Sequence, residues 1–335
     1  MQPQATAPAL LRQRLPWLGG DLQTLRNALL PAPPPLAGER ILLQTHDDSG
    51  DRLWALLNRP SGQASGLLAV LVHGLSGHEA SPYMTVAARR LLQDGHAVAR
   101  LNMRGAGPSR ADCRQHYHAG RSADLADALA DLCDIGGWDG GVLIGFSLGG
   151  NIALKCAAEA AADDPLRAVA TVSAPIDLAH TSRHMLRRRN WVYHQALLQP
   201  FKREVLSMQG LTEAERFAVR RSRNFLEFDD CFVAPRNGFA GAWDYYGRSM
   251  ALQYLDDIAV PGLLIQAQDD PIVPARAYLA RDWRRNPLLL PRLPRHGGHV
   301  GFHGPEPEPW YLSEIAGFLQ RISRRTVRQA NSSTY

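Results

Sequence analysis

The chain of 335 residues is 45% hydrophobic and 21% charged, which is typical of a globular protein with one large core. Its longest apolar runs, residues 67–72 and 142–146, are far shorter than the roughly 20 residues that a membrane-spanning helix needs. The formal net charge of +5 is modest for this length, so we expect no nucleic-acid partner.

Two further features concern the compartment and metal binding. The opening residues 1–16 lack the basic segment, apolar stretch and cleavage site of a secretory signal, so we predict a cytoplasmic protein. The cysteines are widely spaced, and no CxxC pair is present to hold a metal. We expect them to be reduced and mostly structural. They are Cys113, Cys133, Cys156 and Cys231.

The first half of the chain alternates between strand and helix patterns. Residues 1–39 are predicted to form an N-terminal extension that packs on the core. The stretches 40–45 and 53–57 flank a turn-forming cluster at 47–51, which predicts a β-hairpin. Three rounds of an apolar strand followed by a helix come next. These rounds are 67–72 with 83–92, 97–103 with 122–132, and 141–146 with 148–162.

The alternation of strands and helices predicts the fold class. Strands that are apolar on both faces indicate a mostly parallel sheet covered by helices on both sides, so the class is α/β. A fourth strand is predicted at 168–173, and the next apolar strand pattern begins only at 262. The interval 176–258 contains Arg-rich and aromatic helical patterns, including 183–205 and 211–221, and we interpret it as a helical lid insertion.

The pattern of a sheet protein resumes after the insertion. A helix at 275–283, a short strand at 288–293 and an amphipathic helix at 310–322 complete the predicted sequence of elements. The core is therefore expected to consist of residues 40–175 and 259–323. The polar residues 324–335 are expected to form a disordered tail.

A candidate nucleophile lies in the third round of strand and helix. Gly145-Phe146-Ser147-Leu148-Gly149 fits the G-x-S-x-G pattern and stands directly between an apolar strand and a helix. Such a sharp turn needs small flanking residues, and it holds the serine at a helix N-terminus, where developing negative charge is favoured. The pattern predicts that Ser147 is a nucleophile. A strand-to-helix turn without chemistry is the alternative.

A serine hydroxyl needs a general base and a third group that orients this base. In this arrangement the acid and the histidine follow the serine along the chain. The candidate acids are Asp269 and Asp270, although an Asp-Asp-Pro turn can also serve as a helix cap. The candidate bases are His296 and His299, and we favour His299 because two preceding glycines permit a tight loop. A surface-loop histidine is the alternative.

The oxyanion of the reaction would be bound by two backbone amides. The first is the amide of Leu148, the residue after the nucleophile. The loop 73–77, His-Gly-Leu-Ser-Gly, follows the strand at 67–72 and resembles the His-Gly loop of α/β hydrolases. This resemblance implies that Leu75 supplies the second amide and that His73 has a structural role. A glycine-rich loop of this kind is also frequent in other α/β proteins.

Further motifs make the chain resemble the YheT-like branch of the α/β-hydrolase superfamily, which is related to the ABHD-type hydrolases. They are Pro-Trp-Leu-Gly-Gly-Asp-Leu-Gln-Thr-Leu at 16–25, Asn-Met-Arg-Gly at 102–105, Glu-Phe-Asp-Asp at 227–230 and Tyr-Tyr at 245–246. The resemblance implies a serine esterase that acts on small-molecule or lipid-like esters, with no metal or organic cofactor. It also favours Asp270 over Asp269, because the acid of this superfamily usually stands three residues after a small residue such as Ala267.

Two other functions remain open at this point. One is a catalytically silent scaffold whose Arg-rich lid, with Arg187, Arg188 and Arg189, binds an anionic partner. The other is acyl transfer from the same nucleophile to an alcohol or thiol. A metal site at Asp229 and Asp230 is not expected, since adjacent carboxylates without a histidine more often cap helices or pair with arginine.

Overall fold

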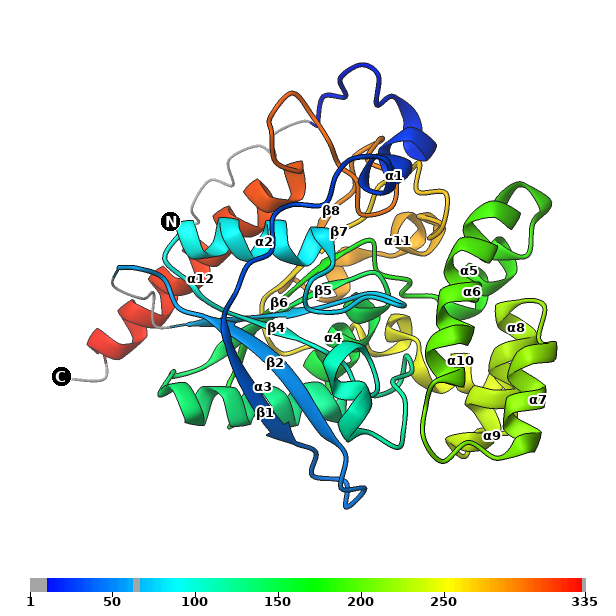
Figure 1. Cartoon of the computed structure of the whole chain (residues 1–335). Helices are drawn as coiled ribbons and strands as arrows, with labels where there is room; N and C mark the ends of the chain where they lie inside the picture. Colours follow the sequence, from blue (N-terminus) through cyan, green and yellow to red (C-terminus); the bar gives the residue numbers. More distant parts are fainter. Residues whose placement is uncertain (1–10, 63–66, 333–335) are drawn as a thin grey trace.

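An eight-stranded sheet runs through the middle of the computed structural model, which describes residues 11–62 and 67–332 (Figure 1). The strand order is β1-β2-β4-β3-β5-β6-β7-β8. The strands are β1 (Glu39–Gln44), β2 (Arg52–Asn58), β3 (Leu68–Val72), β4 (Ala97–Leu101), β5 (Gly141–Phe146), β6 (Leu166–Val172), β7 (Gly262–Ile265) and β8 (Leu289–Arg292). Strands β1 and β2 form the predicted antiparallel hairpin, and β2 is also antiparallel to β4. The other pairs are parallel, which confirms the α/β class.

Helices cover both faces of the sheet, because the central strands are buried on both sides. Apolar residues of α2 (Pro82–Gln93) and α12 (Trp310–Ser332) belong to the core on one face. Residues of α3 (Ala123–Gly136) and α4 (Leu148–Glu159) belong to the core on the other face. As a result of this cover on both faces, every residue of β3 and β5 is buried.

The chain between β6 and β7 is helical, and Figure 1 shows it on the right, beyond the ends of the strands. Its helices are α5 (Leu178–Met185), α6 (Trp191–Leu206), α7 (Glu213–Arg221), α8 (Phe225–Phe228), α9 (Ala234–Arg236) and α10 (Ala242–Ser249), with shorter turns at η2 (Arg188–Asn190), η3 (Asp229–Val233) and η4 (Ala251–Tyr254). The pattern at 183–205 spans two helices rather than one. The break falls at η2, where the Asn190 side chain donates to the His184 carbonyl.

Three predicted segments differ from the structure. The N-terminal extension contains a helix, α1 (Gly19–Leu29), which is absent from the elements predicted above. The helix predicted at 275–283 is shorter, with α11 at Arg276–Ala280 and η5 at Trp283–Arg285. The tail predicted to be disordered from residue 324 continues α12 up to Ser332, because the sequence there has no proline or glycine to end a helix; residues 333–335 lie outside the described residues.

The structure also bears on membrane spans and cysteines. Over residues 11–62 and 67–332, no helix has both the length and the apolar character that crossing a bilayer requires. All four cysteines are free thiols. Cys113, Cys133 and Cys156 are buried, and burial raises the pKa of each of these thiols, whereas Cys231 is exposed. This placement agrees with the reduced, structural cysteines that the spacing predicts.

The loop after β4 holds a buried arginine, Arg104, which is fully inaccessible to solvent. Its Nε and Nη2 donate to both oxygens of Asp124 at 2.9 and 2.6 Å, and Nη1 donates to Asp51 at 3.0 Å. Loss of one partner of a buried ion pair leaves an uncompensated charge. We therefore expect Arg104→Ala to lower the free energy of unfolding by about 3–5 kcal/mol in chemical denaturation.

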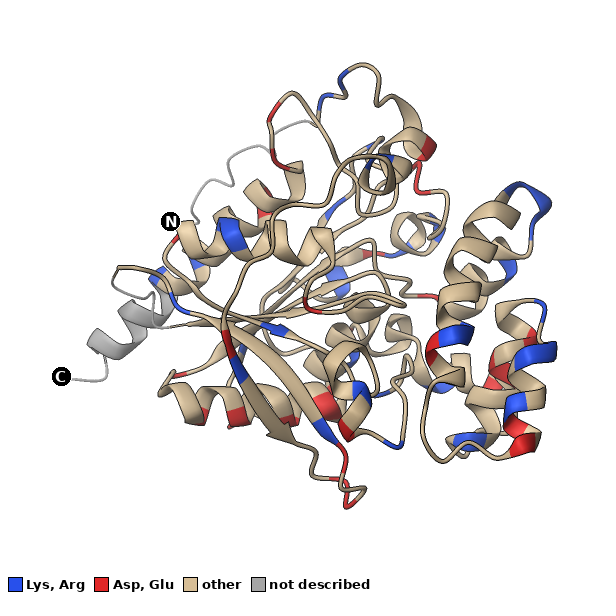
Figure 2. Cartoon of the chain, viewed as in Figure 1, with Lys and Arg blue, Asp and Glu red and all other residues tan. Residues whose placement is uncertain are grey.

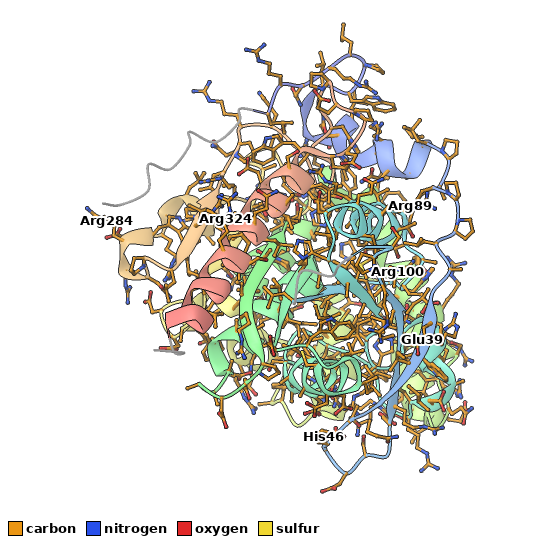
Figure 3. The ribbon with its side chains drawn as sticks, turned by 90° about the vertical axis from the view of Figure 1, so that its left-hand side faces the viewer. Glu39, His46, Arg89, Arg100, Arg284 and Arg324 are labelled. Carbon is orange, nitrogen blue, oxygen red and sulfur yellow. The ribbon has the colours of Figure 1, made fainter. Side chains whose placement is uncertain are left out.

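A matched control for this variant is Arg284→Ala. Arg284 points away from the molecule (Figure 3), is 91% exposed and forms an ion pair with Asp282. Exposed ion pairs contribute about 0–1 kcal/mol, so this variant should unfold almost as the unchanged protein does. Equal losses in the two variants would contradict a structural role for the buried cluster.

Candidate active site

Ser147 occupies the turn between β5 and α4 in a conformation that few residues adopt. Its φ is 49° and its ψ is −122°, which lies outside the ordinary helix and strand regions. The turn is also crowded. A Cβ at Gly145 would lie 2.5 Å from the Cα of Gly150, and one at Gly149 would lie 2.3 Å from the carbonyl oxygen of His73. Glycines at 145 and 149 therefore allow the strand, the helix and the neighbouring loop to meet at the serine.

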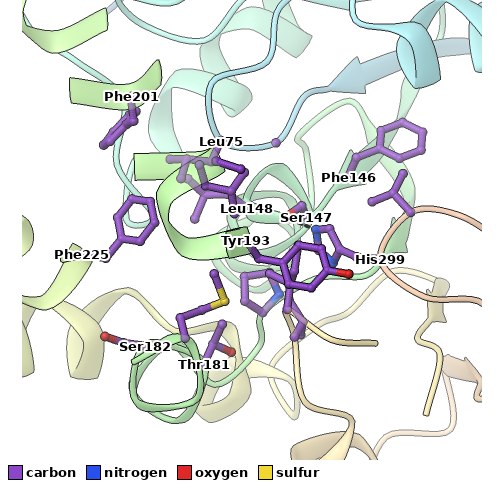
Figure 4. Close-up of a pocket in the computed structure, with 18 of the residues that line it drawn as sticks. Leu75, Phe146, Ser147, Leu148, Thr181, Ser182, Tyr193, Phe201, Phe225 and His299 are labelled. Carbon is purple, nitrogen blue, oxygen red and sulfur yellow. Dashed lines mark hydrogen bonds between the residues drawn. The ribbon is translucent and has the colours of Figure 1, made fainter. Parts of the chain in front are cut away.

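Three candidate side chains form one hydrogen-bonded chain at the carboxyl ends of the strands. Ser147 follows β5, Asp270 follows β7 and His299 follows β8. The His299 Nε2 is 3.0 Å from the Ser147 Oγ, and its Nδ1 is 2.9 Å from the Asp270 Oδ2. Figure 4 shows the His299 ring beside Ser147 at the wall of a pocket. A neutral imidazole held in this way can accept a proton from the hydroxyl while donating to the carboxylate.

The two adjacent aspartates have different partners. The Asp270 carboxylate is inaccessible to solvent, and its Oδ1 accepts hydrogen bonds from the amides of Ile272 and Val273 at 2.8 and 2.9 Å. Asp269 is 3.0 Å from the His296 Nδ1 and accepts from the amide of Gly298. Only Asp270 touches His299, whereas Asp269 and His296 form a separate, more exposed pair.

The loop after β3 runs directly over the serine. A Cβ at Gly74 would lie 3.0 Å from the Cβ of Ser147, so backbone approaches the nucleophile here. In the described part of the chain, the amides of Leu75 and Leu148 donate to no acceptor. Both residues adjoin the nucleophile along the chain or through the Gly74 loop, and an unpaired amide is the kind of donor that a tetrahedral oxyanion requires.

His73 links this loop to the loop after β4 through hydrogen bonds of its ring. Its Nδ1 is 2.7 Å from the carbonyl oxygen of Gly74, and its Nε2 accepts from the amide of Met103 at 3.1 Å. Complete burial lowers the pKa of the ring to about 4, so His73 is neutral at physiological pH. A neutral ring that bridges two backbone segments has the structural role that the resemblance implied.

Helix α1 packs on the loop that carries His299. The Thr24 Oγ1 accepts a hydrogen bond from the amide of His299 at 2.8 Å. The buried Gln23 side chain donates to the carbonyl of His303 at 2.8 Å and accepts from its amide at 2.6 Å. In the sequence, residues 16–25 stand out only as a family motif. The contact of Gln23 and Thr24 with the loop of His299 forms only in the folded chain.

A cavity of about 480 Å³ opens beside Ser147 and His299. Its wall combines residues from α1, from the loop after β3 and from the helical insertion, and most of the wall is apolar. Apolar residues around the cavity include Leu75, Leu148, Leu178, Met185, Phe201 and Phe225. In Figure 4, Phe201 and Phe225 lie on the side of the pocket opposite to His299.

One carboxylate, Asp229, also lines this cavity. The Tyr246 hydroxyl donates to its Oδ2 at 2.6 Å, and the Ser182 Oγ lies 3.2 Å from the Tyr246 Oη. Burial raises the pKa of Asp229 to about 7, and the neighbouring Asp230 contributes in the same direction. Asp230 itself accepts from the amide of Ala242 at 2.9 Å. The two carboxylates thus serve different partners.

The raised pKa of Asp229 predicts a dependence of stability on pH. The folded protein binds this proton more tightly than the unfolded chain does, so the carboxyl lowers stability as pH rises from about 4 to about 7. Asp229→Asn removes this loss. We compare the free energies of unfolding of the variant and the unchanged protein. The difference, variant minus unchanged protein, should be about 2–3 kcal/mol larger at about pH 8 than at about pH 5.

Chemical denaturation of both proteins at the two pH values measures this difference. The other ionisable groups are the same in both proteins, so their contributions cancel. Asp230→Asn is the matched control, because this neighbouring carboxylate is exposed and has an amide partner. A gain for Asp229→Asn that is the same at both pH values would contradict the assignment of a raised pKa to this group.

Comparison with known families reveals what the chain is similar to. Residues 70–304 match the family model described as the alpha/beta hydrolase fold. YheT of Escherichia coli, named for a proposed esterase activity, is 32% identical over 257 residues, which cover 75% of each chain. A medium-chain fatty acid ethyl ester synthase/esterase of Saccharomyces cerevisiae is 25% identical over 289 residues, covering 78% of this chain and 63% of the yeast protein.

Two more similarities concern a phospholipase and a solved structure. The mouse phospholipase ABHD3 is 24% identical over 288 residues, which cover 84% of this chain and 70% of the mouse protein. The structure of the Pyrococcus furiosus esterase Pf2001 superposes with a TM-score of 0.57 at 19% identity, covering 87% of this chain and 97% of that one. This structural similarity concerns the fold alone.

Proposed function

The chain belongs to the α/β-hydrolase fold family, in its YheT-like branch, and from this premise we propose that it cleaves carboxylic esters through a covalent acyl-enzyme. Ser147 attacks the ester carbonyl, and His299 takes the hydroxyl proton and passes it to the leaving alcohol. Asp270 orients the imidazole. Water then attacks the acyl-enzyme with the same histidine as general base, which releases the acid and restores the serine.

The single observation that carries this proposal is the continuous contact from Asp270 through His299 to Ser147, at 2.9 and 3.0 Å. The amides of Leu75 and Leu148 would stabilise the oxyanion, each by roughly 3 kcal/mol in the transition state. No cofactor enters any step, because proton transfer and nucleophilic attack require only these side chains.

The cavity supports a preference among esters. We propose that the helical insertion between β6 and β7 acts as a lid that shapes this space, since Phe201 and Phe225 come from it. An apolar wall favours an apolar chain, with about 0.8 kcal/mol for each buried methylene group. We also propose that the protein acts in the cytoplasm.

This function predicts covalent labelling and turnover. Purified protein should react with a fluorophosphonate probe at a single serine and should hydrolyse p-nitrophenyl esters, with kcat/KM rising about three- to fourfold for each added methylene until the cavity is full. A panel of esters of increasing chain length, with mass spectrometry of the labelled peptide, measures both. Inertness toward every ester and toward the probe would contradict the proposal.

The purified protein also allows a test of the two alternative functions, a catalytically silent scaffold and acyl transfer. Salt-sensitive binding to anionic vesicles by a protein that the probe does not label would favour the silent scaffold. In Figure 2 the turn between α5 and α6 carries basic residues alone, whereas basic and acidic residues are mixed over the other helices of the insertion. Product analysis with competing alcohols would detect acyl transfer.

A further inference from the structure

The active-site cavity has polar groups on two opposite sides, and most of its wall is apolar. One side holds Ser147 and His299. The other holds Ser182, whose hydroxyl is linked through Tyr246 to Asp229. Figure 4 shows Ser182 and Phe225 on the opposite side of the pocket from Ser147 and His299. A substrate that fills the cavity from the nucleophile would therefore reach a second polar group.

The carboxylate on the far side of the cavity has hydrogen-bonding capacity that the protein does not use. The Asp229 Oδ2 accepts from Tyr246, but within residues 11–62 and 67–332 its Oδ1 accepts no hydrogen bond from a side chain or an amide. No arginine, lysine or histidine of the described chain forms an ion pair with it. Asp229 is half-buried at a mostly apolar cavity wall, where a carboxylate oxygen gains from a donor that the protein does not supply.

The fold does not explain this carboxylate. Its neighbour Asp230 makes the contact that stabilises the chain locally, since it accepts from the amide of Ala242 at the start of α10. Tyr246, whose hydroxyl also contacts Ser182, holds Asp229 in one orientation at the cavity wall. The Asp229 carboxylate is therefore oriented, partly exposed to the cavity and able to accept a further hydrogen bond. Such a group is suited to bind a ligand that carries a hydrogen-bond donor.

We propose that Asp229, positioned by Tyr246, is a second recognition point of the active site and accepts a hydrogen bond from a hydroxyl or a protonated amine on the substrate. The donor is carried at the end of an apolar segment of the ester, because Asp229 and Ser147 line one cavity whose wall is mostly apolar. This inference rests on the proposed ester hydrolysis and adds a substrate class to it. The preferred substrates are esters with a polar, donor-bearing terminus.

The test compares esters that differ only at the terminus. One series consists of p-nitrophenyl esters of unsubstituted, ω-hydroxy and ω-amino alkanoates of equal chain length, over several chain lengths. A second series has the same termini on the alcohol part of an acetate ester. For each protein, the measured quantity is the ratio of kcat/KM for the substituted ester to kcat/KM for its unsubstituted partner.

For the unchanged protein we expect this ratio to have a maximum at one chain length, in one of the two series. Asp229→Leu should lower the ratio at that length about tenfold or more. Asp229→Asn retains an oxygen acceptor without charge, so it distinguishes the two donors: a hydroxyl preference falls only in part, whereas an ammonium preference is lost. Asp230→Asn is the matched control and should leave the ratio unchanged.

Two results separate the inference from the function on which it rests. Cleavage of unsubstituted esters with a ratio that neither chain length nor Asp229→Leu alters would overturn the second recognition point and leave ester hydrolysis standing. A protein that cleaves no ester in either series would remove both. Because each ratio is taken within one protein, a partly unfolded variant changes both kcat/KM values equally and cannot imitate a loss of selectivity.

Discussion

Ser147→Ala is expected to abolish fluorophosphonate labelling and to lower kcat for p-nitrophenyl esters by roughly 10⁴- to 10⁶-fold. The loss is large because no acyl-enzyme can form without the hydroxyl that stands 3.0 Å from the His299 Nε2. Residual hydrolysis would come from the binding site and the oxyanion amides acting on water. Gel fluorescence after labelling and steady-state kinetics of the purified variant measure the two effects.

A control separates this loss from misfolding. Ser207 is exposed, donates to the Glu204 carbonyl and is not among the described residues that line the cavity, so Ser207→Ala should retain labelling and turnover. The strained turn at 147 imposes a positive φ on any residue there, and alanine differs from serine only in the hydroxyl. Undiminished labelling of Ser147→Ala would show that another residue is the nucleophile.

Asp270→Asn is the second change for which we expect a large effect, a fall in kcat of about 10⁴-fold with little change in KM. An amide in place of the carboxylate favours the wrong tautomer of His299 and no longer stabilises the imidazolium. The Asn Oδ1 can still accept from the amides of Ile272 and Val273, so the turn after β7 should keep its shape.

Asp269→Asn is the matched control for this variant, since the two residues are adjacent and the change is the same. Asp269 contacts His296 and the Gly298 amide instead of His299, so we expect kcat to fall less than about tenfold. Thermal unfolding of both variants excludes a general loss of structure. The opposite ranking of the two variants would assign the orienting role to Asp269.

Much of the fold follows from short-range patterns. Uniformly apolar strands such as β3 and β5 have to be buried on both faces, and this requirement predicts a parallel sheet with helices on each side. The family was also within reach of the sequence, because the motifs at 16–25, 102–105 and 227–230 stand at recognisable positions along the chain. The ends of helices are harder to predict from sequence. Helix α12, for example, continues to Ser332, ten residues beyond its predicted end at 322.

The α/β class, the turn at Ser147 and the few candidate partners of this serine are predictable from the chain alone, because each depends on residues that are close in the sequence. Whether Asp269 or Asp270 touches His299 depends on the folded chain, since the two carboxyl groups have the same chemistry and point in different directions. The tertiary structure also brings α1 onto the histidine loop and Asp229 to the cavity. Thr24 and His299, which are in contact, are 275 positions apart, and no local pattern encodes such a contact.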